Sequence, residues 1–432
     1  MSKTTPGPGT QSYRGGLNRH QVTAWRNAIF IIFGVCGIGM ASWVARLPAV
    51  RDALHASTEQ MGWLIFGIAA GSIIGLVASS HIVARFGART TIVWCLILGP
   101  VGLTVAALGA TVGPSFGLIF ASLVLFGGAF GMCDVAMNVS GAANERTLHR
   151  AIMPLFHAAF SGGTIIGAAL GALAEGLHVP IVAHIAIICV LMAFSAVLAV
   201  RSFQSEHIIG ETAEAVPDDD FSKSWRGRLS IWRDPRTLLI GLVILGMAFS
   251  EGSANDWLTL AMVDGHGVSN ANGAVIFGVF VTAMTVGRIA GVFVLDRFGR
   301  VPVLRACAVL AGVGLLVVIF VPIVWVAVIG VIAWGLGSSL GFPVGMSAAA
   351  DDPKTAAARV SAVATIGYFA FLVGPPTIGF LGEHFGLLHA LLVVLVLVAV
   401  AGIVSGAARK PELASADTAP TEAVPVEAVP TE

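Results

Sequence analysis

Long apolar runs constrain the fold of this chain more than any other feature. Runs of about 20 residues with few charges recur along most of its length, and a helix of that length crosses about 30 Å of hydrocarbon. Because lipid offers the backbone no hydrogen-bond partners, such runs must fold as membrane-spanning helices. We predict an all-α membrane protein with twelve of them, over residues 25–46, 60–82, 91–112, 115–141, 152–174, 178–200, 238–258, 272–295, 301–321, 323–348, 360–382 and 387–408.

The composition supports this interpretation and excludes several functions. Hydrophobic residues make up 56% of the chain and charged residues only 11%, against roughly 25% charged in soluble proteins. The five cysteines stand singly within predicted helices, so the sequence predicts no metal, no cofactor and no disulfide. A catalytic constellation and a nucleotide-binding loop are both missing from the sequence, so we predict neither an enzyme nor a nucleic-acid partner.

The basic residues predict an orientation in the membrane. Of the 24 Lys and Arg, all but Arg46, Arg51 and Arg288 fall in the tails or in loops on one side of the predicted helices. The positive-inside rule places that side in the cytoplasm. We therefore expect a multi-pass protein of the cytoplasmic (inner) membrane with both termini cytoplasmic, and we expect it to be monomeric.

An internal repeat divides the chain into halves. "VARFGAR" at 83–89 matches "LDRFGRV" at 295–301, and "GALAEG" at 171–176 matches "GFLGEHFG" at 379–386. Repeats of this kind are typical of secondary transporters, whose binding site lies between the halves. We predict a cytoplasmic N-tail (1–24), two six-helix bundles (25–201 and 237–409), a cytoplasmic linker (202–236) and a disordered C-tail (410–432).

Two smaller expectations concern the segments between spans. In the linker, Trp225, Leu229 and Trp232 share one helical face beside several arginines. Such a segment is predicted to rest on the anionic leaflet, with a solvated linker as the alternative. Glu175 and Glu383 end their helices on the outside, and we expect both to be solvated caps.

The repeated loops carry a family resemblance. "RFGAR" and "GRIAGVFVLDRFGR" resemble the loop signature of the major facilitator superfamily, in which the loop helps to latch the two halves. The resemblance implies a fold of two pseudo-symmetric bundles. The first copy has Ala84 where the acid is expected, which weakens the predicted latch in that half. The alternative for these loops is a tight turn with basic anchors, and for Arg288 an internal pair near the loop. The implied latch residues are Arg85, Gly87, Arg89, Arg288, Gly291, Asp296, Arg297, Gly299 and Arg300.

An acid and an amide stand inside the fourth predicted span. Asp134 and Asn138 are one turn apart on the same helical face, and a charge in a span is a functional candidate by default. "DVAMN" resembles the E-x-x-x-N of sugar:proton symporters in the fucose-permease branch of the superfamily. We predict that Asp134 carries the coupling proton and Asn138 binds substrate. The alternative is a structural ion pair between Asp134 and Arg150.

The seventh span carries a second polar pair at the same spacing. Glu251 and Asn255 mirror Asp134 and Asn138, and the resemblance implies that this helix lines the cavity. We predict proton coupling by Glu251 and substrate binding by Asn255, with a polar helix end as the alternative. Asp256 and Trp257 follow towards the outer surface. Trp257 is a candidate for stacking on a sugar, or else an anchor at the membrane interface.

Two further polar side chains are candidate substrate ligands. His157 lies near the start of the fifth span and is predicted to face Asp134 across a cavity. Tyr368 lies in an apolar helix where its hydroxyl needs a partner. Both have a structural alternative, as a hydrogen-bonded interfacial histidine or a satisfied buried tyrosine. The glycines Gly163, Gly167 and Gly171 predict close helix packing.

Together these features predict a secondary active transporter. It would move a small polar solute, sugar-like or a related metabolite, by alternating access and proton-coupled symport, with protons, solute and lipid as its partners. The alternatives are a proton-coupled exporter of drugs or metabolites and a non-transporting receptor or scaffold. The first predicted span holds no acid between Arg26 and Asp52, so coupling rests on Asp134 and Glu251.

Overall fold

The structure, a computed structural model, is all-helical and describes residues 17–148, 152–204, 230–352 and 355–410. Eleven helical segments in these ranges are long and apolar enough to cross a membrane. One of them, α3, is 54 residues long and holds two of the twelve predicted spans. The predicted fold class is confirmed. The amphipathic stretch around Trp225 and the C-tail beyond Lys410 lie outside the described residues.

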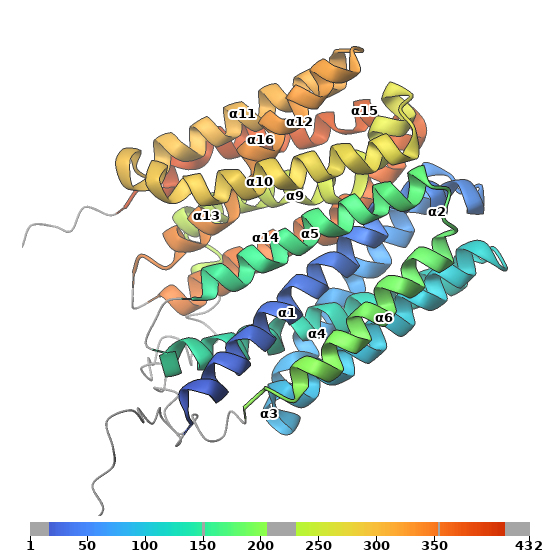
Figure 1. The fold of residues 1–432 in the computed structure, drawn as a ribbon. Coiled ribbons are helices and arrows are strands. Elements are labelled where there is room, and N and C mark those ends of the chain that lie inside the picture. Colours follow the sequence, from blue (N-terminus) through green and yellow to red (C-terminus); the bar gives the residue numbers. More distant parts are fainter. Residues whose placement is uncertain (1–16, 149–151, 205–229, 353–354, 411–432) are drawn as a thin grey trace, which may run out of the picture.

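The N-terminal half packs as one bundle, drawn in blue to green in Figure 1. Within α3 the chain bends sharply at Gly87, which ends one span and begins the next. Pro154 lies in the first turn of α5, where a missing N–H is tolerated. The elements are α1 (Arg19–Val44), α2 (Leu47–Leu54), α3 (Thr58–Thr111), α4 (Phe116–Leu148), α5 (Met153–Gly176) and α6 (Ile181–Val200).

The C-terminal half forms the second bundle, drawn in yellow to red. The predicted span 323–348 is broken into α12 and α13 at Ser339 and Leu340, where the backbone hydrogen bonds of α12 end. The last predicted span is likewise divided into three short elements. The elements are α9 (Pro235–His266), α10 (Asn270–Phe298), α11 (Arg300–Phe320), α12 (Val324–Ser338), α13 (Gly341–Ala349), α14 (Ala356–Phe385), α15 (Leu387–Ala390), α16 (Leu392–Val404) and η3 (Ser405–Ala408).

The repeat seen in the sequence recurs in the backbone. Gly87 and Gly299, which the repeat aligns, adopt nearly the same conformation, with φ/ψ of 78°/156° and 76°/173°. A positive φ of this kind is readily available only to glycine. The guanidinium groups of Arg85 and Arg297 each lie 5.5 Å from the ring of the following phenylalanine. The two loops are therefore equivalent turns, as the sequence predicted.

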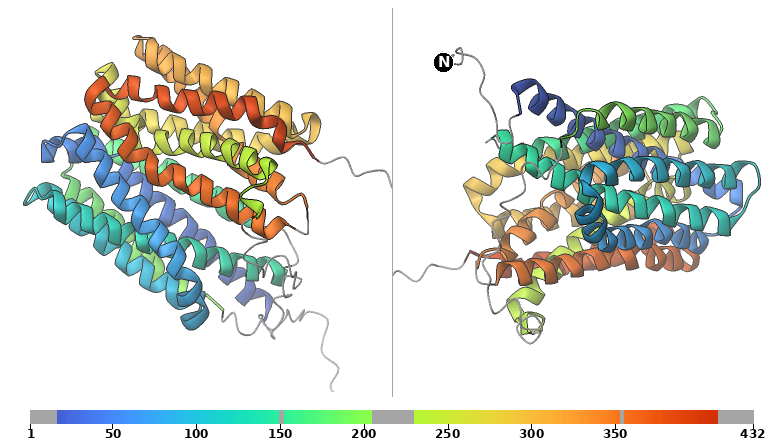
Figure 2. Two further views of the ribbon diagram at one scale, coloured as in Figure 1. Left: turned by 180° about the vertical axis from the view of Figure 1, so that it is seen from behind. Right: turned by 90° about the horizontal axis from the view of Figure 1, so that it is seen from below.

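The two ends of the molecule differ. The start of α1 and the end of η3 lie at one end and α2 lies at the other (Figures 1 and 2). We call the first the basic end, because Arg85, Arg89, Arg297 and Arg305 are exposed there. The opposite end, around α2, is the closed end. The outer surface between them carries many exposed apolar side chains, among them Val77, Phe293 and Ile403, as contact with lipid requires.

Polar contacts join the bundles at the closed end. Arg51 on α2 forms an ion pair with Asp264 on α9, and the amide of Asn270 donates to Asp52 at 3.1 Å. The backbone N–H of Thr58, at the start of α3, donates to Glu383 at 2.8 Å. An acid at a helix N-terminus is stabilised by the helix dipole.

The prediction of a solvated cap is wrong for Glu175, whose side chain is 19% exposed and ion-paired, whereas Glu383 is exposed. Glu175 lies 3.2 Å from the guanidinium of Arg46, whose side chain is only 4% exposed, and it also accepts from Asn270 of the other bundle. Glu383 accepts from the first turn of α3. Both residues are part of the contact between bundles, which the sequence could not show because their partners are far away in the chain.

The glycine stripe of α5 packs directly against α1, as predicted. A Cβ atom on Gly163 would lie 2.0 Å from the carbonyl oxygen of Gly34, and one on Gly167 would lie 2.5 Å from that of Ile38. Only glycine permits such an approach between helix backbones. This contact fixes α5, and with it His157, beside α1.

Candidate functional site

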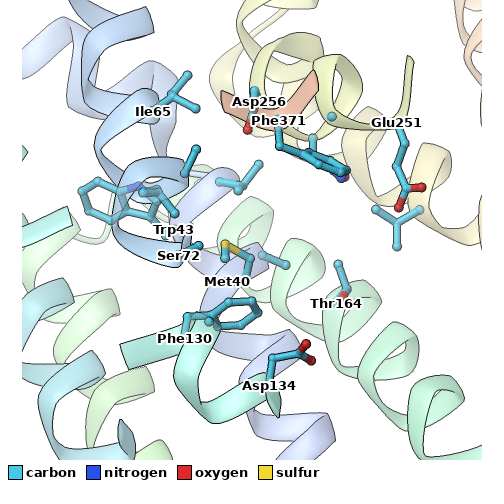
Figure 3. Close-up of a pocket in the computed structure, with 18 of the residues that line it drawn as sticks. Met40, Trp43, Ile65, Ser72, Phe130, Asp134, Thr164, Glu251, Asp256 and Phe371 are labelled. Atoms are coloured by element: carbon cyan, nitrogen blue, oxygen red, sulfur yellow. The ribbon is translucent and has the colours of Figure 1, made fainter. Parts of the chain in front are cut away.

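A central cavity of about 360 Å³ lies between the bundles. Most of its lining is apolar, and its polar side chains come from both halves of the chain. Asp134 on α4 lies on one side, and Glu251 and Asp256 on α9 lie on the other (Figure 3). Its remaining polar lining residues are Ser72, Ser161, Thr164, Asn255, Arg288 and Tyr368.

Asp134 belongs to a short hydrogen-bonded chain. The amide nitrogen of Asn138 lies 3.2 Å from a carboxylate oxygen of Asp134 and 2.8 Å from its backbone carbonyl oxygen. The amide oxygen of Asn138 lies 3.1 Å from Nε2 of His157. Since that oxygen accepts, Nε2 of the imidazole must carry a hydrogen and donate it.

This geometry changes the role expected of His157. An amide bridges the acid and the imidazole, and an amide does not carry a proton between them. Asn138 therefore orients both groups, and the contacts between Asp134 and His157 in the described ranges run through this amide. The imidazole also meets the ring of Phe33 edge-on, with centroids 5.2 Å apart. Arg150, the alternative partner of Asp134, lies outside the described residues.

Glu251 has a cationic partner. Nη2 of Arg288 on α10 lies 2.8 Å from a carboxylate oxygen of Glu251. Both residues line the central cavity, so this ion pair is part of the site. The pairing also takes Arg288 away from the loop signature that follows it in sequence. The latch role of Arg288 stays a prediction. What the structure shows for its side chain is the ion pair with Glu251.

The other predicted ligands on α9 and α14 divide into two groups. Asn255 and Tyr368 line the central cavity. Trp257 is completely buried and lines neither described cavity, so it is not the interface anchor that we offered as an alternative. Asp256, to which the sequence assigned no role, lines the cavity instead. On a helix, neighbouring positions point in different directions, and only contacts with other helices decide which one faces inwards.

The aromatic part of the lining was not predicted from the sequence. Trp43 on α1, Phe130 on α4, Phe160 on α5 and Phe371 on α14 all face the cavity. In a chain with this many apolar helices, an aromatic residue that lines a cavity has the same local pattern as one that faces lipid. Phe130 lies one turn before Asp134 on the same helical face, which is the one signal that could have indicated it.

A larger space leads from the central cavity towards the basic end. This vestibule has a volume of about 1610 Å³ and shares Ser161, Glu251, Arg288, Tyr368 and Phe371 with the central cavity. Its outer part is lined by residues of the basic end, among them His157, Asp296, Arg300, Arg305, Arg409 and Lys410. The central cavity is thus reached from the basic end.

Within the described ranges, the ion pairs of the predicted latch residues do not join the two bundles. Arg85, Arg89, Asp296 and Arg297 are exposed, and the ion pairs found at the basic end in the described ranges lie within the C-terminal bundle. Arg300 contacts both carboxylate oxygens of Asp351, at 2.7 and 2.9 Å. Arg236 also reaches Asp351, at 2.9 Å, and Arg359 lies 3.1 Å from Asp234.

The fold and the cavity between two repeated bundles define a membrane transport protein. A model of the Major Facilitator Superfamily matches residues 28–293 and 254–431. The chain therefore belongs to this superfamily of secondary transporters, and it is not an enzyme. A small-molecule substrate is implied by that membership.

Individual similarities place the chain no more narrowly than this. An uncharacterized transporter of the superfamily from Yersinia pestis is 29% identical over 82% of this chain and 88% of its own length. The nucleoside transporter NupG superposes with a TM-score of 0.68 at 14% identity, covering 90% of this chain and 98% of that one. The Escherichia coli fucose:proton symporter FucP gives 0.59 at 17% identity, covering 90% and 100%. These likenesses support the fold and do not single out the fucose-permease branch.

Proposed function

We propose that this protein is a proton-coupled symporter of a small polar solute and that Asp134 carries the coupled proton. The observation that carries the proposal is a carboxylate in the cavity, 3.2 Å from an amide and without a cationic partner in the described ranges. A carboxylate in so apolar a cavity alternates between charged and neutral forms only by exchanging a proton. The name of one fold neighbour, a fucose:proton symporter, supports the same reaction class.

Neutralisation of Asp134 would lower the cost of closing the cavity around the solute. The carboxylate of Asp134 is costly to keep charged in a dry cavity, and one proton neutralises it. Glu251 is a weaker candidate for the same role, because Arg288 already neutralises it at 2.8 Å. In this mechanism Asn138 holds the carboxylate of Asp134 in place, and Asn255 and Tyr368 supply hydrogen bonds to the solute.

The membrane orientation is part of the proposal. With the basic end in the cytoplasm, as the positive-inside rule requires, the vestibule faces the cytoplasm and the closed end faces outwards. The halves then rock about the central cavity, and the polar contacts of Arg51 and Glu383 at the closed end break when the cavity turns outwards. The exposed turns at Gly87 and Gly299 would approach each other in that second state.

The test is transport by the purified full-length protein in liposomes with an imposed proton gradient. Asp134→Asn should abolish solute accumulation against its own gradient and leave counterflow exchange of solute intact. Glu59→Gln, which removes an acid from the first turn of α3 at the closed end, is the matched control and should behave as wild type. Accumulation that persists in Asp134→Asn would show that the coupling proton is carried elsewhere.

A further inference from the structure

Two polar groups that line the central cavity have no partner among the described residues. The carboxylate of Asp256 forms no ion pair or hydrogen bond with any described residue, unlike Asp134 and Glu251 in the same cavity. The indole Nε1 of Trp43 is a buried donor without an acceptor, on a side chain that is completely buried. Buried polar groups in proteins nearly always have a partner. The described part of the chain supplies no partner to the buried Trp43 Nε1 or to the half-buried carboxylate of Asp256.

The charges of the cavity define what that partner must carry. Arg288 is the one basic side chain among the described lining residues, and Glu251 occupies it. Asp134 and Asp256 remain as acids without a cation. A concave site lined by charge of one sign and apolar walls raises the local concentration of the opposite charge. A positively charged solute fits this cavity, and an anion is excluded from it.

The apolar walls narrow the chemistry further. The rings of Trp43, Phe130 and Phe371 line the same cavity as the unpartnered carboxylate, and Figure 3 shows all three around it. Aromatic faces attract ammonium groups, and combining them with a carboxylate is a common way of binding organic cations. A hydrated metal ion would gain nothing from such walls.

We propose that the central cavity binds an organic cation whose ammonium group lies at Asp256 and whose hydrogen-bond acceptor, such as a hydroxyl, meets the indole N–H of Trp43. This inference rests on the proposed transport function and names its solute class. It assigns the solute charge to Asp256 and leaves the proton to Asp134. Because Trp43 belongs to the N-terminal bundle and Asp256 to the C-terminal one, the solute would join the two bundles.

Binding can be tested apart from transport. The purified full-length protein is heated with ammonium compounds and their neutral counterparts: choline against 3,3-dimethylbutan-1-ol, and glucosamine against glucose. We expect an ammonium member to raise the melting temperature and its neutral counterpart to leave it unchanged, since a ligand that binds only the folded state stabilises it. Asp256→Asn should weaken that binding about tenfold or more, because it removes one partner of a buried charge pair. Glu59→Gln should leave it unchanged.

A second variant keeps the test decisive if Asp256→Asn does not fold. Trp43→Phe removes the N–H but keeps an aromatic face, so it should weaken choline several-fold and leave tetramethylammonium, which has no acceptor, unaffected. Equal stabilisation by the neutral compounds, no stabilisation by any ammonium compound, or ammonium binding that survives Asp256→Asn would overturn the proposal. Such results would leave coupling through Asp134 intact, whereas accumulation that persists in Asp134→Asn would leave the cation site intact.

Discussion

The two polar pairs on α4 and α9 have the same spacing and opposite surroundings. Asp134 and Asn138 bond to each other, and Asn138 extends the contact to His157 on α5. Glu251 makes no hydrogen bond with Asn255 in the described ranges and forms an ion pair with Arg288 on α10. The spacing places the acid and the amide of each pair on one face of their helix. The neighbouring helix then decides whether the acid contacts an amide or a cation.

The difference separates two uses of a buried acid. An acid held by a neutral amide keeps its full charge within the cavity, so protonation changes the charge of the site. An acid held by a guanidinium is already neutralised, and its removal leaves a cation unpaired. The comparison predicts that equivalent substitutions on the two sides have unequal effects.

The largest effect is expected at the ion pair. Arg288→Met leaves Glu251 without its cation, and breaking a fully buried pair destabilises by about 3–5 kcal/mol. The Arg288 side chain is 37% exposed, so solvent reduces the expected loss to roughly 2 kcal/mol. Thermal unfolding in detergent measures it, and Glu251→Gln combined with Arg288→Met should recover most of the loss. An unchanged melting temperature in the single variant would remove the distinction between the two acids.

A smaller effect should separate the two amides. Asn138→Ala removes a hydrogen bond to a carboxylate that faces the cavity, where water can enter, and we expect it to cost about 1 kcal/mol. Asn255→Ala removes an amide that makes no side-chain hydrogen bond in the described part of the chain, and it should change stability by no more than a few tenths of a kcal/mol. Unfolding of the two variants side by side is the measurement, and a larger loss for Asn255→Ala would reverse the assignment.

The smallest effect concerns an acid outside the spans, Asp234 at the start of α9. Burial alone would raise the pKa of this carboxyl, but the hydrogen bonds from Thr237 and the charge of Arg359 outweigh burial and hold the pKa below its ordinary value of 3.8. The stabilisation from Asp234 is therefore complete above pH 3.8 and is lost as the pH falls through the lower folded value.

Arg359→Gln should bring that pKa back towards its ordinary value, so Asp234 contributes less stability and its loss on acidification is complete at a higher pH. The change is expected to be a few tenths of a kcal/mol, since the pair is partly exposed. Unfolding measured from about pH 5 down to about pH 2 reports it. Arg305→Gln, which removes an exposed arginine from the vestibule, is the control and should follow the wild-type curve.

Much of the fold could be predicted because each segment that crosses lipid must by itself be long, apolar and helical. Run length and polarity located the helices, and the repeat located the turns at Gly87 and Gly299. The break at Ser339 between α12 and α13 was missed, although Pro343, which cannot donate a helical hydrogen bond, lies four residues beyond it in the same apolar run. Glu175 was misjudged because its partner Arg46 is remote in sequence, and the contact of Glu383 with Thr58 was missed for the same reason.

The site could be predicted only as far as charges inside spans reveal it. Asp134, Glu251, Asn255 and Tyr368 do line the cavity, and each is a polar residue that is rare in such helices. The inward direction of Asp256 and the burial of Trp257 depend on how α9 rotates against its neighbours. A rotation of α9 by one residue would turn Trp257 towards the cavity in place of Asp256. The local sequence pattern does not determine this rotation.

The contact between Asn138 and His157 has a consequence for spectroscopy. With Nε2 committed to the amide oxygen, the imidazole is locked in one tautomer, and Nδ1 is its one remaining nitrogen for titration. A nitrogen-15 label in the ring would then show one nitrogen fixed across the pH range and the other responsive. A change in the distance between α4 and α5 during the transport cycle would therefore change the nitrogen signals of His157.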